Sequence, residues 1–137
     1  MRYLAIDHGR RRTGLAICDP SETIVSPFAV LDNPKNLCGK IADVIKEQSV
    51  EAVVVGLPLN MNGSQGSQAK LVISFAEQLK KFTDVPIYFQ DERLSTFGAE
   101  EKFADVELSR KEKLKRLDAV AAAQILENFL DSSQNLQ

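Results

Sequence analysis

The segment at residues 51–58 constrains the fold more than any other part of this sequence. It reads Glu-Ala-Val-Val-Val-Gly-Leu-Pro, so apolar residues occupy both of the alternating positions that a strand presents to its two faces. The β-branched valines in this run favour a strand. A strand buried on both faces is typical of a parallel sheet that helices cover on both sides. The sequence therefore predicts an α/β fold.

The sequence before and after residues 51–58 predicts the order of the other elements. Short apolar runs at 3–6, 15–18 and 24–31 are separated by turn residues and predict three antiparallel strands. Apolar residues at helical spacing predict one helix over about 34–48 and another around 72–79, while residues 86–90 resume a strand pattern. A further helix is expected at 96–103. Ser109 and Glu112 form a capping box that opens a last helix, which is expected to end near Leu130.

These elements predict one domain over residues 1–130, followed by a polar C-terminal tail at 131–137. The predicted domain has a five-stranded mixed sheet, with strands 1–3 antiparallel and helices on both faces. A chain of 137 residues is long enough to bury a core without disulfides or metals. We find no internal repeat and no linker that would indicate a second domain.

The charge balance needs explanation if the chain binds nucleic acid. Seventeen Lys and Arg residues face 19 Asp and Glu residues, giving a net charge of -2, whereas nucleic-acid-binding domains are usually basic. Positive charge is nevertheless concentrated at Arg10, Arg11 and Arg12 and in the run at 110–116, which holds five basic residues and one Glu. That run is equally well explained as a solvated helix face. The composition therefore does not exclude nucleic acid and favours salt-sensitive binding.

Several features bear on the cellular compartment. No apolar run approaches the roughly 18 residues of a membrane-spanning helix. The N-terminal segment reaches Asp7 too early for a signal peptide. Cys18 and Cys38 lack the spacing of a zinc site or a disulfide framework, so two reduced thiols are expected. We therefore expect a cytoplasmic protein.

Two aspartates stand out as candidate site residues. Asp7 ends the first predicted strand, where it can also simply hydrogen-bond the following turn. Asp118 lies on the apolar stripe of the last helix, four residues after Leu114 and seven before Ile125. A carboxylate that faces the core is costly unless it is paired or binds a metal. The alternative is an Asp at the edge of the stripe, paired with Arg116 or a neighbouring lysine.

Asp91 and Glu92 follow the fifth predicted strand, and as neighbours they point to opposite faces. Sites in α/β sheets form beyond the carboxyl ends of the strands, so one of these two carboxylates can join Asp7 there. Three converging carboxylates repel one another unless cations are bound. Oxygen ligands favour Mg²⁺ or Mn²⁺. Two such ions can activate water and stabilise the leaving oxygen in phosphodiester hydrolysis.

Two loops and one histidine are further candidates for a functional site. Residues 9–14 have the Gly-x4-Gly spacing of a P-loop, but the required Lys-Ser/Thr is missing and a strand follows, so we reject a P-loop. Residues 56–63 form a strand-to-helix loop whose backbone amides and Asn60 and Asn62 side chains can contact phosphates or sugars. His8 is the only histidine, and alternation along a strand points it away from Asp7.

Four motifs occur in order along the chain, at residues 5–9 with 12–16, 56–58 with 60–63, 91–96 and 118–122. Together they resemble the YqgF family, also called RuvX, whose members carry the names Holliday junction resolvase and pre-16S rRNA nuclease. The resemblance implies an RNase H-like fold and a metal-dependent nuclease site with Asp7, Glu92 and Asp118 as catalytic residues and metal ligands. It thus favours Glu92 over Asp91, which strand alternation leaves open.

The resemblance also implies a phosphate-binding role for Arg12 and Arg93. Both match arginines of the family motifs, and a guanidinium offers bidentate geometry to phosphate. The alternatives are an exposed hairpin arginine for Arg12 and an ion pair with Asp91 for Arg93. Arg10, Arg11, Asn60 and Asn62 complete the residues expected to contact nucleic acid.

We expect an endonuclease that trims structured RNA, most simply the 5′ side of pre-16S rRNA, with Mg²⁺ or Mn²⁺ in a two-metal site. Resolution of branched DNA is the alternative within the same chemistry. A monomer suits rRNA trimming, a homodimer suits junction cleavage, and ribosomal particles are conceivable partners. Two other classes were considered: a phosphotransferase, which needs a second such domain, and a non-catalytic RNA-binding or ribosome-associated factor.

Overall fold

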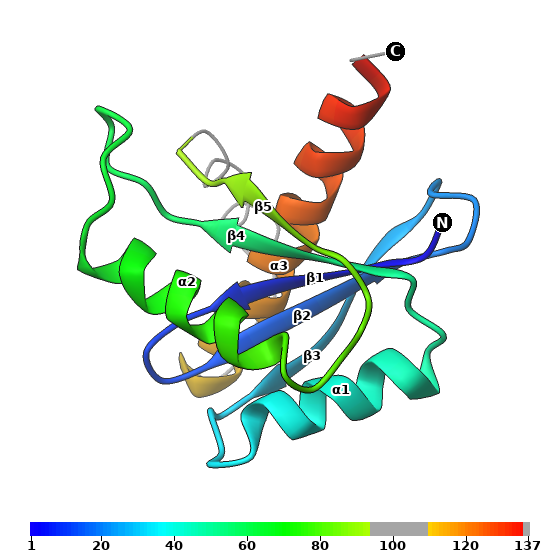
Figure 1. Cartoon of the computed structure of the whole chain (residues 1–137), viewed down its shortest axis with the longest axis horizontal. Helices are drawn as coiled ribbons and strands as arrows, with labels where there is room; N and C mark the ends of the chain where they lie inside the picture. Colours follow the sequence, from blue (N-terminus) through cyan, green and yellow to red (C-terminus); the bar gives the residue numbers. More distant parts are fainter. Residues whose placement is uncertain (94–109, 136–137) are drawn as a thin grey trace.

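The computed structural model describes residues 1–93 and 110–135, with side chains given for 1–93 and 117–132. Within these residues one five-stranded sheet is flanked by helices (Figure 1). The predicted helix at 96–103 and the cap residue Ser109 lie outside the described residues. The elements in chain order are β1 (Tyr3–His8), β2 (Thr13–Cys18), β3 (Val25–Leu31), α1 (Leu37–Glu47), β4 (Ala52–Leu57), α2 (Ser67–Leu79), β5 (Ile87–Asp91) and α3 (Arg110–Asn135).

The strand order in the sheet is β3-β2-β1-β4-β5. Strands β1, β2 and β3 are antiparallel, whereas β4 is parallel to both β1 and β5. The predicted mixed sheet with strands 1–3 antiparallel is confirmed. This order places the carboxyl ends of β1, β4 and β5 at the same edge of the sheet.

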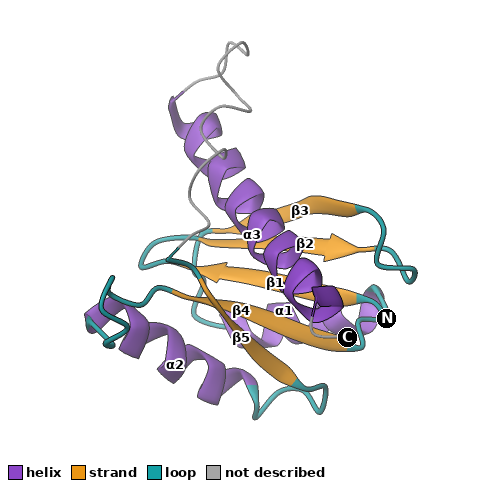
Figure 2. Ribbon diagram, turned by 90° about the horizontal axis from the view of Figure 1, so that it is seen from above, coloured by secondary structure: helices purple, strands orange, loops and turns teal. Residues whose placement is uncertain are grey.

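Strand β4 is buried on both faces, as its sequence predicts, and its alternating side chains belong to two cores. Val53 and Val55 pack with residues of α1 and α2 in one core, while Val54 packs with α3 in the other. Figure 2 shows α3 crossing one face of the sheet, with α1 and α2 on the opposite face. The α3 side is built largely from small residues such as Ala5 and Ala122, which let the helix approach the strands closely.

The start of α1 and the end of α3 differ from the prediction. Helix α1 begins at Leu37, not near Pro34, because residues 34–36 form a turn in which Leu37 N–H donates to the Pro34 carbonyl. Helix α3 continues to Asn135, past the predicted end near Leu130. Leu130 is buried against the sheet, and no proline or glycine interrupts the helix in the residues that follow.

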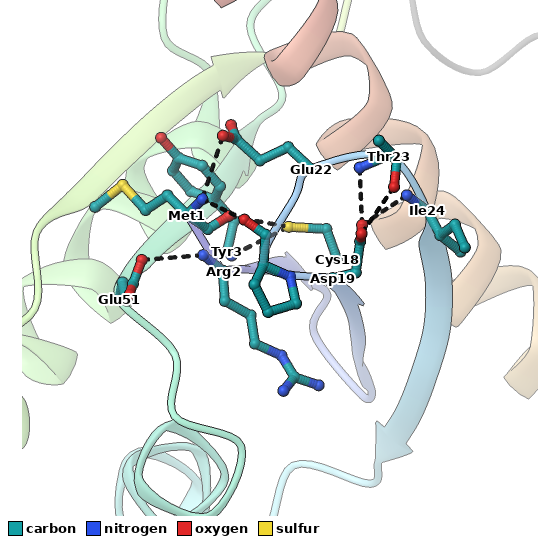
Figure 3. A network of polar contacts seen from close by, with 10 residues as sticks. Met1, Arg2, Tyr3, Cys18, Asp19, Glu22, Thr23, Ile24 and Glu51 are labelled. Atoms are coloured by element: carbon teal, nitrogen blue, oxygen red, sulfur yellow. Dashed lines mark hydrogen bonds and ion pairs between the residues drawn. The ribbon is translucent and has the colours of Figure 1, made fainter.

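The turn between β2 and β3 is held by Asp19, at the end of the sheet where the chain begins (Figure 3). The Asp19 carboxylate accepts hydrogen bonds from Thr23 N–H, Thr23 Oγ1 and Ile24 N–H at 2.7–2.8 Å. These bonds lower the pKa of Asp19 to about 2. They also keep Ile24 out of β3, which begins at Val25, although the sequence pattern predicts a strand from residue 24.

Cys18 and Cys38 are free thiols, of which Cys18 is buried and Cys38 partly buried. In the part of the chain that the structure describes, no helix combines the length and the apolar character needed to cross a membrane.

Candidate functional site

Three carboxylates from distant parts of the chain meet at the edge of the sheet where the parallel strands end. Asp7 lies near the end of β1, Glu92 follows β5 directly, and Asp118 lies on α3. The backbone N–H of Glu92 donates to the carbonyl of Leu57 at 3.1 Å, which fixes Glu92 at the end of β4. The carboxyl ends of β1, β4 and β5 and the crossing of α3 therefore bring together the three residues that the sequence singles out.

Two glycines make this convergence sterically feasible. Gly14 pairs with Asp7 across β1 and β2, and a Cβ at residue 14 would overlap the backbone carbonyl of Asp118. A Cβ at Gly56 would stand 2.7 Å from the carboxyl carbon of Glu92. Neither role was predicted from the sequence, although a glycine inside a strand often marks a close approach of other atoms.

The electrostatics of the site reflect its burial and its like charges. Burial, and then the charge of Asp118, raise the pKa of Asp7 to about 6. Burial, followed by the charges of Asp7 and Asp91, raises the pKa of Glu92 to about 8. The ionised forms of Asp7 and Glu92 are thus disfavoured, and a cation bound among the carboxylates would stabilise them.

The donor chemistry of these residues fits a hard divalent cation, because carboxylate oxygens are the ligands that Mg²⁺ and Mn²⁺ prefer. Among the described residues, however, no group of three or more His, Cys, Asp or Glu side chains is already arranged to hold a metal ion. The charge of Asp118 raises the pKa of Asp7 and that of Asp7 raises the pKa of Glu92, but the three carboxylates do not form a closed cage. Asp7, Glu92 and Asp118 are the residues that would hold the ion.

Arg12 reaches into this site from the hairpin between β1 and β2. Its Nε donates to Asp118 Oδ2 at 2.7 Å, and both side chains are half-buried. The pairing of Asp118 with a neighbouring basic residue of its own helix was the alternative weighed from the sequence. Among the side chains that the structure describes, the partner of Asp118 is Arg12 of the first hairpin, so Arg12 is not merely an exposed hairpin arginine. The side chain of Arg116 and those of the preceding lysines lie outside the described residues.

Arg93 forms the ion pair with Asp91 that the sequence analysis considered as an alternative. Arg93 Nη2 lies 2.6 Å from Asp91 Oδ2, and Arg93 Nε and the Arg93 backbone N–H also donate to the same carboxylate. Hydrogen bonding from Arg93 lowers the pKa of Asp91, whereas the pKa of Glu92 is raised, in part by Asp7. The structure thus places Glu92 beside Asp7 and Asp91 beside Arg93.

Asn60 and Asn62 form hydrogen bonds within the loop between β4 and α2. Asn60 Nδ2 donates to Ser64 Oγ at 3.0 Å, and Asn62 Oδ1 accepts from the backbone N–H and the hydroxyl of Ser64. Both asparagines are exposed. Arg93 Nη1 donates to the Met61 carbonyl at 3.3 Å and so ties this loop to the end of β5. The asparagine side chains thus shape the loop, and a contact with nucleic acid would be an additional role.

Arg10 and Arg11 are exposed at the tip of the first hairpin. Arg10 extends to the first residues of α2, where its Nε donates to Gln68 Oε1 at 3.3 Å and its Nη2 to Ser67 Oγ at 3.4 Å. The hairpin tip and the start of α2 therefore form one surface. Arg12 of the same hairpin connects this surface to the carboxylates by its bond to Asp118.

The side chain of His8 lies on the face of the sheet opposite to that of Asp7, as strand alternation predicts. Its ring stacks on Phe75 of α2 with centroids 4.1 Å apart, and burial lowers its pKa. Its Nδ1 contacts Thr13 Oγ1 at 2.9 Å, while the Thr13 hydroxyl donates to Asn33 Oδ1 at 2.6 Å. Because the single hydroxyl proton goes to Asn33, Nδ1 of His8 carries the proton in its own bond. His8 therefore stabilises the hairpin from the α2 side of the sheet and does not face the carboxylates.

A mixed sheet of this order, covered on both faces by helices, with acidic residues at the ends of its parallel strands, defines the RNase H-like class. Solved structures share the fold at low identity. A RuvC from T. thermophilus in complex with a Holliday junction substrate matches with a TM-score of 0.58 and 17% identity, covering 91% of both chains. The fowlpox virus Holliday junction resolvase matches with a TM-score of 0.56 and 15% identity, covering 97% of this chain and 99% of the viral one.

Residues 1–132 match the RuvX family, described as Holliday junction resolvase, and the chain belongs to this family. A relative from Roseiflexus sp. (strain RS-1) is 42% identical over 135 residues, 97% of this chain and 96% of the relative. A relative from Anaeromyxobacter sp. (strain Fw109-5) is 44% identical over 133 residues, 96% and 97% of the two chains. Both relatives carry the name "Putative pre-16S rRNA nuclease".

Proposed function

We propose that this chain is a divalent-metal-dependent endonuclease that hydrolyses phosphodiester bonds in structured nucleic acid, with the 5′ end of pre-16S rRNA as its substrate. The observation that carries the proposal is the convergence of Asp7, Glu92 and Asp118, with the pKa of Asp7 raised to about 6 and that of Glu92 to about 8. Such an acidic cluster, partly removed from water, is unfavourable by itself and becomes favourable with a bound cation.

The three carboxylates have the role of holding Mg²⁺ or Mn²⁺. A two-metal site supplies an activated water and stabilises the leaving oxygen of a phosphodiester. Asp7 interacts electrostatically with both of the other acidic residues, because the charge of Asp118 raises the pKa of Asp7 and the charge of Asp7 raises that of Glu92. We therefore assign Asp7 the central position among the three residues that would hold the metal.

Arg12 and Arg93 have the role of binding phosphate groups on either side of the acidic cluster. Each now binds a carboxylate, Arg12 that of Asp118 and Arg93 that of Asp91. A phosphate can replace the carboxylate and accept a bidentate pair of hydrogen bonds from the guanidinium. Arg10 and Arg11 at the hairpin tip and Asn60 and Asn62 in the β4–α2 loop extend the surface along which the substrate backbone lies. These contacts position the nucleic acid without reading its sequence.

The substrate assignment rests on the names of the relatives, which specify pre-16S rRNA. A second candidate is branched DNA, because the family is described as Holliday junction resolvase and the solved structures include resolvases bound to junction DNA. Association with ribosomal particles, a cytoplasmic location and the choice between monomer and homodimer stay predictions.

Cleavage assays with both substrates test the proposal. Purified protein is incubated with pre-16S rRNA and with a four-way DNA junction, in Mn²⁺ or in EDTA, alongside Asp7→Asn and the matched control Asp43→Asn. Asp43 is an exposed aspartate on α1, on the other face of the sheet from α3. We expect Mn²⁺-dependent cleavage of the rRNA that Asp7→Asn abolishes and Asp43→Asn preserves, with RNA binding retained in both variants.

The outcomes separate the alternatives. Cleavage of the junction alone would favour branched DNA as the substrate. No metal-dependent cleavage of either substrate, with RNA binding intact, would favour a non-catalytic RNA-binding factor and overturn the enzyme assignment. Full activity in Asp7→Asn would remove Asp7 from the site.

A further inference from the structure

Arg12 binds the one carboxylate of the three that α3 contributes. Its Nε lies 2.7 Å from Asp118 Oδ2, and each of the two side chains is 28% exposed. One oxygen of a proposed metal ligand is thus already occupied by a cation that belongs to the chain. This exposure leaves room for the side chain to exchange its partner, because neither group is locked in the core.

The backbone brings Arg12 to Asp118 through a close approach of the first hairpin and α3. Gly14 lies against the carbonyl of Asp118 so tightly that a Cβ at residue 14 would overlap it. Gly14 is also the residue of β2 that pairs with Asp7. Arg12, two residues before Gly14, therefore reaches the same end of the sheet as Asp7 and Asp118.

The backbone of the hairpin is fixed from the other side of the sheet. Gly9 N–H donates to the Arg12 carbonyl at 2.9 Å, closing the turn. Asn33 Nδ2 donates to the Gly9 carbonyl at 2.8 Å, and the buried Thr13 hydroxyl donates to Asn33 Oδ1. With its backbone anchored in this way, Arg12 can change partners by rotating its side chain alone.

We propose that Arg12 holds Asp118 in the metal-free protein and competes with the divalent ion for this carboxylate, so that metal binding frees the guanidinium for a substrate phosphate. The inference rests on the proposed function, because it takes Asp118 as a metal ligand. A guanidinium and a divalent cation on one carboxylate repel each other, so binding of the ion weakens the Arg12–Asp118 bond. The released guanidinium stays at the site on its anchored hairpin and can bind phosphate. Arg12 is thus a positioning residue that links metal binding to substrate binding.

Mn²⁺ binding without nucleic acid provides the first test, measured by calorimetry on the full-length protein and on Arg12→Gln. Because the substitution removes the competing cation, we expect Arg12→Gln to bind Mn²⁺ about fivefold more tightly than the wild type, the equivalent of about 1 kcal/mol. Affinity for RNA in the presence of Mn²⁺ is expected to fall in the same variant. Equal or weaker Mn²⁺ binding by Arg12→Gln overturns the inference.

Arg11→Gln is the matched control, because it removes the same charge from the same hairpin at an exposed position. The tightening in Arg12→Gln must exceed any tightening in Arg11→Gln, which measures the effect of net charge alone. Tightening of equal size in both variants overturns the inference. Circular dichroism and thermal unfolding check that each variant is folded.

A second measurement uses the wild-type protein and needs no variant to remain folded. The Nε–H resonance of Arg12 in NMR spectra reports its hydrogen bond to Asp118. We expect added Mg²⁺ to shift this resonance and to speed its exchange with water, toward the state that Asp118→Ala, which lacks the acceptor, shows without metal. A resonance that does not respond to saturating Mg²⁺ overturns the inference.

Asp7→Asn distinguishes this inference from the proposed function. If Asp7→Asn loses Mn²⁺ binding while Arg12→Gln matches the wild type, the inference fails and the metal-dependent nuclease stands. If Asp7→Asn binds Mn²⁺ as the wild type does, the proposed metal site fails, and the role of Arg12 fails with it.

Discussion

Gly56 lies directly beneath the carboxyl group of Glu92. A Cβ at residue 56 would stand 2.7 Å from Glu92 Cδ and Oε1 and 2.5 Å from Ile125 Cδ1. The absence of a side chain at this position of β4 therefore creates the space into which the carboxylate of Glu92, just after β5, and an apolar residue of α3 both fit. This glycine couples the position of Glu92 to the packing of α3 on the sheet.

Replacing Gly56 by alanine tests this relationship. Either Glu92 or Ile125 must move, so we expect Gly56→Ala to lower the free energy of unfolding by about 1–3 kcal/mol. Displacement of Glu92 is also expected to weaken Mn²⁺ binding. Urea unfolding and calorimetric Mn²⁺ titration measure the two effects.

Gly39→Ala is the matched control for Gly56→Ala. Gly39 lies within α1, and the nearest atom to an added Cβ is Phe82 Cε1 at 4.0 Å. Because alanine is the better helix former, this substitution is expected to stabilise the protein by about 0.5–1 kcal/mol. Loss of stability in Gly39→Ala as large as in Gly56→Ala would contradict the steric explanation.

The acidic cluster predicts that the metal-free protein loses stability as the pH rises. The pKa of Glu92 is raised from 4.5 to about 8 and that of Asp7 from 3.8 to about 6. Between each pair of values the native protein keeps a proton that the unfolded chain has released. The free energy of unfolding in EDTA should therefore fall by a few kcal/mol from about pH 4 to about pH 8. Urea unfolding across this range measures the decrease.

Glu92→Gln separates the cluster from the rest of the titratable groups. The variant lacks the largest raised pKa, so its stability in EDTA should vary less with pH and exceed that of the wild type near pH 8. Saturating Mg²⁺ should stabilise the wild type most at the high-pH end, where the carboxylates are ionised. The same pH slope in the wild type and in Glu92→Gln would count against the assigned titration of Glu92.

The buried hydroxyl of Thr13 predicts a measurable stability loss in Thr13→Val. Thr13 is fully buried and bridges His8 Nδ1 and Asn33 Oδ1. Valine has nearly the same shape but leaves both partners without their hydrogen bond, at a cost of about 1–3 kcal/mol. Because the hairpin then loses an anchor, cleavage should also decrease. Urea unfolding and a rRNA cleavage assay measure these effects.

Thr83→Val provides the comparison for Thr13→Val. The Thr83 hydroxyl is half-buried and accepts only a long bond, 3.4 Å from the Val85 backbone N–H. We expect its loss to change stability by less than about 0.5 kcal/mol. A cost for Thr13→Val no larger than that for Thr83→Val would show that the His8–Thr13–Asn33 bonds do not stabilise the hairpin.

The fold could be predicted largely because periodicity records burial. Val53, Val54 and Val55 alternate between two cores, and this leaves the pattern of a doubly buried strand in the sequence. The ends of helices are encoded less clearly. The end of α3 at Asn135 could not be predicted from periodicity, because residues 131–135 are polar and include no proline or glycine to end the helix.

The candidate site was only partly readable in the sequence. Asp118 was conspicuous because a carboxylate on an apolar stripe conflicts with burial. Its ion pair with Arg12, and the contact of Gly14 with its carbonyl, join residues more than 100 positions apart and leave no local pattern. The family resemblance favoured Glu92 over Asp91, a choice that strand alternation left open.

Arg93→Gln tests the proposed phosphate contact beside the site. The Arg93–Asp91 ion pair is exposed, so its loss should change the free energy of unfolding by less than about 1 kcal/mol. A phosphate contact, by contrast, releases counterions, so Arg93→Gln should weaken RNA binding and reduce the slope of log K against log salt concentration by about 1. Lys80→Gln removes the same charge at the far end of α2, where Lys80 pairs with Glu77, and should leave the slope unchanged. Fluorescence anisotropy of labelled RNA across a salt series measures the slopes, and equal slopes for Arg93→Gln and the wild type would remove Arg93 from the nucleic-acid interface.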